Sequence, residues 1–151
     1  MMDELFEILL SEISNICKSN TEKKLERICV ILRNNVRHYD WVGFYFAKPD
    51  ENMLILGPFA GEPTEHIEIP YGRGICGQSA ETGKIFIVDD VRKENNYLAC
   101  NVNVKSEMVV PIFKHGKFIG ELDIDSHSVA PFTREDKLFL KRVCEYVAEI
   151  F

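Results

Sequence analysis

Apolar residues recur at helical spacing in two stretches near the beginning of the chain. They return every three or four residues from Leu5 to Cys17 and again from Leu25 to Val36, which is the period of a helix with one buried face. Thr21 is a good N-cap residue, because its hydroxyl can accept a hydrogen bond from a free backbone N–H group. The pattern therefore predicts two opening helices, the second of which begins near Thr21.

The middle of the chain changes to an alternation with a period of two, which is typical of strands with one buried face. A Gly-rich passage interrupts it and predicts a short helix over 75–82. Near the end, a third helical stripe follows Thr133, and Asp136 stands three residues later, which is the spacing of a capping box. The predicted strands cover residues 41–46, 53–56, 66–69, 84–88, 107–113 and 117–126.

These elements predict a single domain, residues 1–151, of the α+β class. We expect a central antiparallel sheet with the N- and C-terminal helices packed on one face. The long loops, near 57–83 and 89–105, then belong on the other face. Loops on a rigid sheet are the usual place for binding and catalytic residues, so ligand binding is expected on that side.

Charge and composition exclude several classes of protein. The chain is 46% hydrophobic and 28% charged, as is ordinary for a globular domain. A net charge of -6 without a basic stripe argues against nucleic-acid binding. The acidic N-terminus lacks the basic region of a signal peptide, and no apolar run approaches the roughly 20 residues that cross a bilayer. A cytoplasmic protein without a membrane partner is therefore expected.

The chain has five cysteines, an odd number that does not suit a framework of structural disulfides. Cys17, Cys29 and Cys144 fall on apolar helix stripes and are expected in the core. Cys76 stands at the start of the short predicted helix, where the helix dipole is expected to lower the pKa of its thiol. Cys100 lies in a polar loop, where a thiol is accessible. These last two cysteines are the candidates for chemistry, and their spacing does not match a zinc motif.

The predicted strand over 117–126 has one strongly acidic face. Strands disfavour Asp, so two of them in one strand favour a functional reason over a merely solvated face. A carboxylate cluster can hold an ammonium group or a metal, and repulsion within it can keep one carboxyl protonated as a general acid. Alternation places Glu121, Asp123, Asp125 and Ile119 on this face, and Phe118, Leu122 and Ile124 on the opposite one.

Residues on two other predicted strands can belong to the same site. Glu107 follows closely after Cys100 on the preceding strand. Trp41 and Tyr45 share a face of the first strand with Gly43 between them, where they either line a cavity or pack as ordinary core. No bound metal is expected, because the spacing of a calcium loop is absent. A metal site remains an alternative, with ligands Glu107, Glu121, Asp123 and Asp125.

A series of short motifs can be followed along most of the chain. They are Trp41–Tyr45, Leu54–Phe59, Gly72–Gly77, Asp89–Val91, Leu98–Cys100, Ser106–Pro111 and Gly120–Asp125. In this order the motifs resemble those of the free methionine-(R)-sulfoxide reductases, which are small stand-alone GAF domains. Each motif alone is weakly specific, but the ordered set is specific. The resemblance implies a GAF-like fold and an oxidoreductase that acts on a sulfur group.

The resemblance also implies a role for each candidate residue. Cys100 matches the catalytic cysteine, whose thiolate attacks the sulfoxide sulfur and becomes a sulfenic acid. A second thiol then condenses with that acid to form a disulfide. Glu107 or Asp123 helps to protonate the departing oxygen. Asp123 and Asp125 hold the ammonium group, and Trp41 packs near the methyl group. The implied site comprises Cys76, Cys100, Trp41, Tyr45, Glu107, Asp123 and Asp125.

Two positions depart from the family pattern. Many members have a cysteine where this chain has His66, and an aspartate where it has Asn101. The chain therefore resembles a two-cysteine subtype with Cys76 as the candidate resolving thiol. The resemblance implies no bound cofactor, free methionine sulfoxide as substrate, a thioredoxin-type dithiol as reductant, and a homodimer. The alternative is a GAF sensor module that binds a small ligand without catalysis, although the acidic strand would repel a phosphate.

Overall fold

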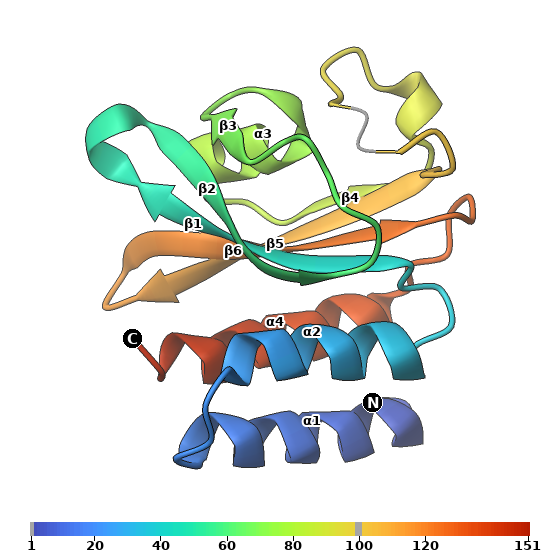
Figure 1. The fold of residues 1–151 in the computed structure, drawn as a ribbon. Helices are drawn as coiled ribbons and strands as arrows, with labels where there is room; N and C mark the ends of the chain where they lie inside the picture. Colours follow the sequence, from blue (N-terminus) through green and yellow to red (C-terminus); the bar gives the residue numbers. More distant parts are fainter. Residues whose placement is uncertain (1, 99–100) are drawn as a thin grey trace.

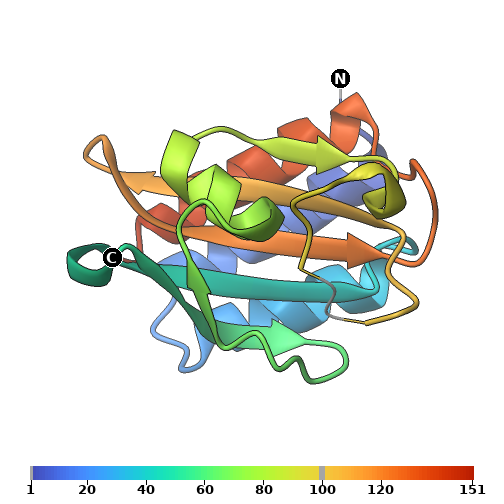
Figure 2. The same cartoon turned by 90° about the horizontal axis from the view of Figure 1, so that it is seen from above.

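A six-stranded antiparallel sheet separates a helical side of the molecule from a loop side (Figure 1). The computed structural model describes every residue except Met1, Ala99 and Cys100. Helices α2 and α4 cover one face of the sheet, and α1 packs on these two helices. The short helix α3 and the long connections cover the opposite face, as the view from above also shows (Figure 2). The predicted α+β layers and the side of the long loops are confirmed.

The strands lie in the order β3-β2-β1-β6-β5-β4, and each neighbouring pair is antiparallel. The main difference from the prediction is the second strand, which continues four residues further to pair with β1. Within the described residues, no helix is both long enough and apolar enough to span a membrane. The elements are α1 (Glu4–Lys18), α2 (Lys24–Asn35), β1 (Trp41–Lys48), η1 (Pro49–Glu51), β2 (Met53–Ala60), β3 (Glu68–Pro70), α3 (Gly74–Thr82), β4 (Phe86–Val88), η2 (Val91–Lys93), β5 (Ser106–Lys114), β6 (Lys117–Ser126) and α4 (Arg134–Ala148).

Side-chain caps fix the start of two helices. The Asp3 carboxylate accepts a hydrogen bond from the Leu5 N–H group at 2.8 Å at the start of α1. At α4, the Thr133 hydroxyl accepts from the Asp136 N–H group, and the Asp136 carboxylate accepts from the Thr133 N–H group. The predicted capping box is therefore confirmed. The same carboxylate accepts from the Tyr39 hydroxyl at 2.6 Å, which ties α4 to the chain just before β1.

The start of α2 differs from the prediction. The helix begins at Lys24, and Thr21 does not cap it. Thr21 instead belongs to a turn in which its N–H group donates to the Ser19 hydroxyl at 3.2 Å. Lys23 has a left-handed backbone with φ of 55°, which a right-handed helix cannot contain. The N-cap preference of Thr21 is thus overridden by the sharp turn that folds α2 back against α1.

A bulge in β6 reverses two predicted orientations. Ile112 of β5 pairs with Gly120 and Phe113 pairs with Phe118, so Ile119 is an extra residue without a partner on β5. Beyond this point the alternation changes phase. Phe118 packs on the loop side and Ile119 on the helical side, the opposite of the predicted faces. The rest of the strand keeps the predicted alternation.

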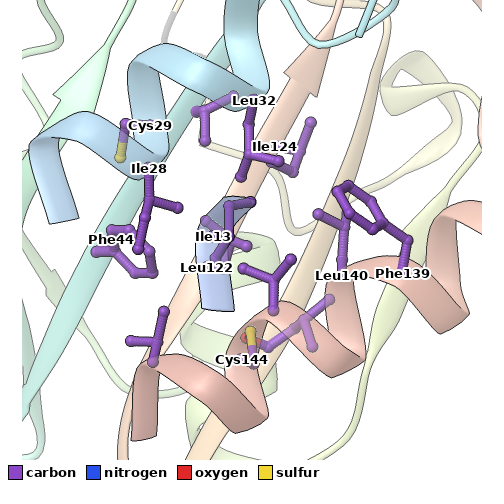
Figure 3. Packing of buried hydrophobic residues seen from close by; sticks show 14 of the residues in the cluster. Ile13, Ile28, Cys29, Leu32, Phe44, Leu122, Ile124, Phe139, Leu140 and Cys144 are labelled. Carbon is purple, nitrogen blue, oxygen red and sulfur yellow. The ribbon is translucent and has the colours of Figure 1, made fainter. Parts of the chain in front are cut away.

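The main core fills the space between the sheet and the helices (Figure 3). Leu122 and Ile124 of β6 point toward Leu140 of α4 and Leu32 of α2, and all four side chains are fully buried. The three helical cysteines are part of this core, as predicted. Burial raises the pKa of each of their thiols: Cys17, Cys29 and Cys144.

Candidate active site

The register of the three central strands gathers polar residues on the loop side of the sheet. Leu122 and Ile124 face the helices, so the residues between them face the loops. The acids of β6 therefore form a row with residues of β1 on one side and residues of β5 on the other. Each acid of β6 has one partner on β1 and one on β5. Asp125 pairs with Trp41 and Glu107, Asp123 pairs with Gly43 and Val109, and Glu121 pairs with Tyr45 and Pro111.

The carboxyl groups of this row are buried, so the alternative of a solvated acidic face is wrong. The exposed fractions are 5% for Glu107, 0% for Glu121, 1% for Asp123 and 2% for Asp125. Both carboxyl oxygens of Glu121, and Oδ1 of Asp123 and of Asp125, have no hydrogen-bond partner among the described residues. Buried polar atoms of this kind are costly. Their presence indicates a site kept for binding or chemistry.

Burial sets the protonation of these acids. It raises the pKa of Asp123, and it raises the pKa values of Glu121 and Asp125 well above their ordinary range. The charge of Asp123 raises the other two further. The sequence predicted raised pKa values from repulsion between the acids, but the loss of hydration on burial is the larger cause. Protonated carboxyl groups are thereby favoured, as a general acid requires.

Trp41 and Tyr45 form an aromatic wall beside the acids and also tie the loop over 61–67 to the sheet. The Trp41 indole N–H donates to the Glu62 carbonyl at 2.9 Å, and the Tyr45 hydroxyl donates to the His66 carbonyl at 2.9 Å. Gly43 is required between them, because a Cβ atom there would overlap the Trp41 ring. Trp41 and Tyr45 each line a cavity, which decides between the two possibilities that the sequence left open.

Cys76 lies in the first turn of α3 and points at the acid row. Its side chain is 4% exposed, and Sγ lies 3.8 Å from Oε2 of Glu107. Burial, followed by the charges of Asp123, Glu121 and Glu107, raises the pKa of the Cys76 thiol well above its ordinary value. The predicted lowering of this pKa is therefore wrong. The dipole of the nine-residue helix α3 is outweighed by desolvation and by neighbouring carboxyl groups.

Two small cavities adjoin this row. One of about 60 Å³ is lined by Trp41, Asp125 and Asn101, among others. The other, of about 10 Å³, is lined by Cys76, Glu107 and Asp123 together with Tyr45 and Leu98. Cys100 lies outside the described residues, so its predicted role stays a prediction. The described residues closest to it in sequence that contact the site, Leu98 and Asn101, line one cavity each.

Sequence reasoning missed two residues that hold the surrounding loops together. The side-chain oxygen of Asn96 accepts from the Gly74 N–H group, and its amide donates to the Gly72 carbonyl, both at 2.8 Å. The Glu62 carboxylate accepts a hydrogen bond from the Asn101 side chain. These contacts join loops that are far apart in the chain, so no local sequence pattern predicts them. They fix the outer boundary of the site.

Replacing the ionisable carboxyl group of Glu121 by an amide is expected to stabilise the protein at neutral and higher pH. Because its folded pKa is raised, the folded state holds a proton that the unfolded state loses above about pH 4.5, so stability falls as pH rises. Glu121→Gln cannot ionise and avoids this loss. We expect it to match the wild type in urea unfolding near pH 4 and to exceed it by about 1–3 kcal/mol near pH 8.

The exposed Glu65 provides the matched control for this measurement. Glu65→Gln changes the same functional group at the surface and should leave the free energy of unfolding within about 0.5 kcal/mol of the wild type. A gap between Glu121→Gln and the wild type that stayed constant from pH 4 to pH 8 would contradict a raised pKa at Glu121.

Comparison with known proteins agrees with this geometry. The GAF domain model matches residues 2–150. The chain is 32% identical to the free methionine-R-sulfoxide reductase of Escherichia coli over 126 residues, which are 83% of this chain and 74% of that protein.

Two solved structures were matched over nearly their whole length. One is the free methionine-R-sulfoxide reductase from Neisseria meningitidis in complex with its substrate. It has a TM-score of 0.91 and 31% identity, with 99% of this chain and 92% of that chain covered. The other is fRMsr of Staphylococcus aureus in complex with substrate, with a TM-score of 0.87 and 34% identity, covering 97% and 95%. With this fold, this sequence identity and this coverage, the chain belongs to the free methionine-R-sulfoxide reductase family of GAF domain proteins.

Proposed function

We propose that this protein reduces free L-methionine-(R)-S-oxide to L-methionine with electrons from cysteine thiols. The observation that carries the proposal is the row of buried, unpartnered carboxyl oxygens beside Trp41 and Cys76. A free amino acid carries an ammonium group that such oxygens can bind, and the indole supplies an apolar surface for its methyl group. Membership of the reductase family supports the reaction.

In the reaction assigned to these residues, the cysteine thiols supply the electrons and no cofactor is needed. The Cys100 thiolate attacks the sulfoxide sulfur, and the oxygen is transferred to Cys100 as a sulfenic acid while methionine leaves. Glu107 or Asp123 donates the proton that the oxygen needs, which the burial of Asp123 favours. The Cys76 thiol then displaces water from the sulfenic acid to form a disulfide. A thioredoxin-type dithiol reduces that disulfide by exchange and completes the cycle.

The raised pKa of Cys76 keeps its thiol from competing with Cys100 for the substrate. A thiol with a raised pKa is a poor nucleophile, so it stays inert while Cys100 reacts with substrate. The two cavities are smaller than most ligand pockets. An amino acid therefore needs them to widen into one space beneath the loop over 61–67 and the segments that contain Leu98 and Asn101. A cyclic nucleotide fits this site less well, because the buried acids would repel its phosphate.

The test is NADPH oxidation through thioredoxin and thioredoxin reductase, with each epimer of free methionine sulfoxide. We expect turnover with the R epimer and none with the S epimer. Cys100→Ser should lose turnover. Cys76→Ser should form at most one methionine per protein and then stop, because its sulfenic acid is not resolved. Cys144→Ser changes a buried thiol on the helical side and should turn over normally.

Two results would count against the proposal. One is the absence of turnover with the R epimer in the reduced wild-type protein. The other is full turnover after Cys100→Ser, which would move the chemistry to another residue. The predicted homodimer and cytoplasmic location are separate expectations, and sedimentation of the purified protein tests the first of them.

A further inference from the structure

One thiol and two carboxyl groups meet beneath α3. Cys76 Sγ, a carboxylate oxygen of Glu107 and one of Asp123 all lie within 4.8 Å of one another. Two of them come from neighbouring strands and one from the helix that covers those strands. All three side chains are at least nine-tenths buried, so their positions are held by packing and not by solvent exposure.

Two further observations favour a cation site at this cluster. Oδ1 of Asp123 and Oδ1 of the adjoining Asp125 are buried without a hydrogen-bond partner among the described residues. The cavity that Cys76, Glu107 and Asp123 line is about 10 Å³, which is close to the space that one water molecule needs. An ion fits this space, whereas a whole amino acid does not.

We propose that Cys76, Glu107 and Asp123 form a binding site for a zinc ion, and that bound zinc inhibits the enzyme. Zinc accepts thiolate and carboxylate ligands together, and a set of three protein ligands leaves its fourth position for water. Magnesium and calcium prefer oxygen ligands alone and more of them. Binding replaces the thiol proton of Cys76 by the metal and releases that proton to solvent.

The distances suit a tetrahedral ion after small side-chain rotations. Bonds of about 2.0–2.3 Å to zinc place neighbouring ligand atoms roughly 3.3–3.8 Å apart. Cys76 Sγ and Glu107 Oε2 are already 3.8 Å apart. Asp123 Oδ1 has no hydrogen-bond partner among the described residues, so this oxygen is free to bind the ion.

The inhibition rests on the proposed function. An ion held here binds the thiol of Cys76, which is the proposed resolving thiol. It also binds Asp123, which is assigned to the ammonium group of the substrate. Zinc and methionine sulfoxide should therefore compete for the same residues. Inhibition should be relieved by a chelator and should weaken as the concentration of methionine sulfoxide rises.

The decisive experiment is calorimetric titration of the reduced, chelator-treated full chain with zinc chloride. We expect one site per chain, with affinity reduced at least tenfold in Cys76→Ala and in Asp123→Asn. Cys144→Ala removes a buried thiol on the opposite face of the sheet and should bind zinc like the wild type. Substitution with cobalt should give a thiolate-to-metal charge-transfer band that is present in the wild type and absent in Cys76→Ala.

The outcomes separate this site from the proposed function. Zinc affinity unchanged in both variants, or a cobalt complex of the wild type without a thiolate band, would overturn the site. Turnover of the R epimer is measured with chelator present and tests the reductase alone. Circular dichroism confirms that each variant is folded, and if Cys76→Ala is not, Asp123→Asn and the wild-type cobalt spectrum still decide.

Discussion

Asp125→Asn should lower kcat/KM for free methionine-(R)-sulfoxide by about thirtyfold or more, mainly through a higher KM. The ammonium group of the substrate favours the ionised form of Asp125, so a charge pair forms on binding. Removing one partner of a buried charge pair costs about 2–5 kcal/mol, and each 1.4 kcal/mol is tenfold. Asp125 is 2% exposed, lines the larger of the two cavities with Trp41, and has an unpartnered oxygen. Steady-state kinetics in the thioredoxin-coupled assay give both constants.

A change in the substrate isolates the ammonium contact. N-acetyl-methionine sulfoxide lacks the ammonium charge, so its kcat/KM with the wild type should be low. Asp125→Asn should lower that kcat/KM little further. Asp50→Asn, an exposed change in the turn between β1 and β2, should leave both constants unchanged. Equal losses for both substrates in Asp125→Asn would show that Asp125 does not bind the ammonium group.

Phe139→Ala should lower the free energy of unfolding by about 3–5 kcal/mol, a large share of the roughly 5–15 kcal/mol typical of a domain. The Phe139 ring is fully buried and stacks on Phe6 of α1 with centroids 4.4 Å apart. Its removal leaves a cavity where α1 and α4 pack together. Urea unfolding followed by circular dichroism measures the loss.

Phe151→Ala is the matched control, because it deletes the same atoms from a ring that is 52% exposed. We expect a loss below about 1 kcal/mol there. Similar losses at Phe139 and Phe151 would mean that the contact between α1 and α4 adds little to stability. The core on the helical side would then be less important than its burial indicates.

Local patterns predicted those parts of the molecule that depend on nearby residues. The capping box at Thr133 needs only a partner three residues away, and it was found as predicted. The acidic face of β6 also followed from alternation alone. At Ile119 the same rule fails, because a bulge is set by pairing with β5 and has no clear local signal. Lys23 is a comparable case, since a left-handed lysine is dictated by the turn between two helices.

The site itself was predicted as a set of residues but not as an environment. Alternation cannot show that Cys76 of α3 comes to lie 3.8 Å from Glu107 of β5, because that contact spans different elements. Nor can it show that the acid row is covered by loops. The pKa of Cys76 was therefore predicted in the wrong direction, since the helix position is local while desolvation depends on the whole fold.

The burial of three cysteines on the helical side affects how fast the protein is damaged by oxidation. Oxidants attack exposed thiolates first. Cys17, Cys29 and Cys144 have raised pKa values and are packed in the core, so the native protein shields them. They become vulnerable only while α1, α2 or α4 detaches, and a sulfinic or mispaired thiol formed then cannot repack. Resistance to irreversible damage is therefore governed by how seldom the helices open, a property separate from the catalytic rate.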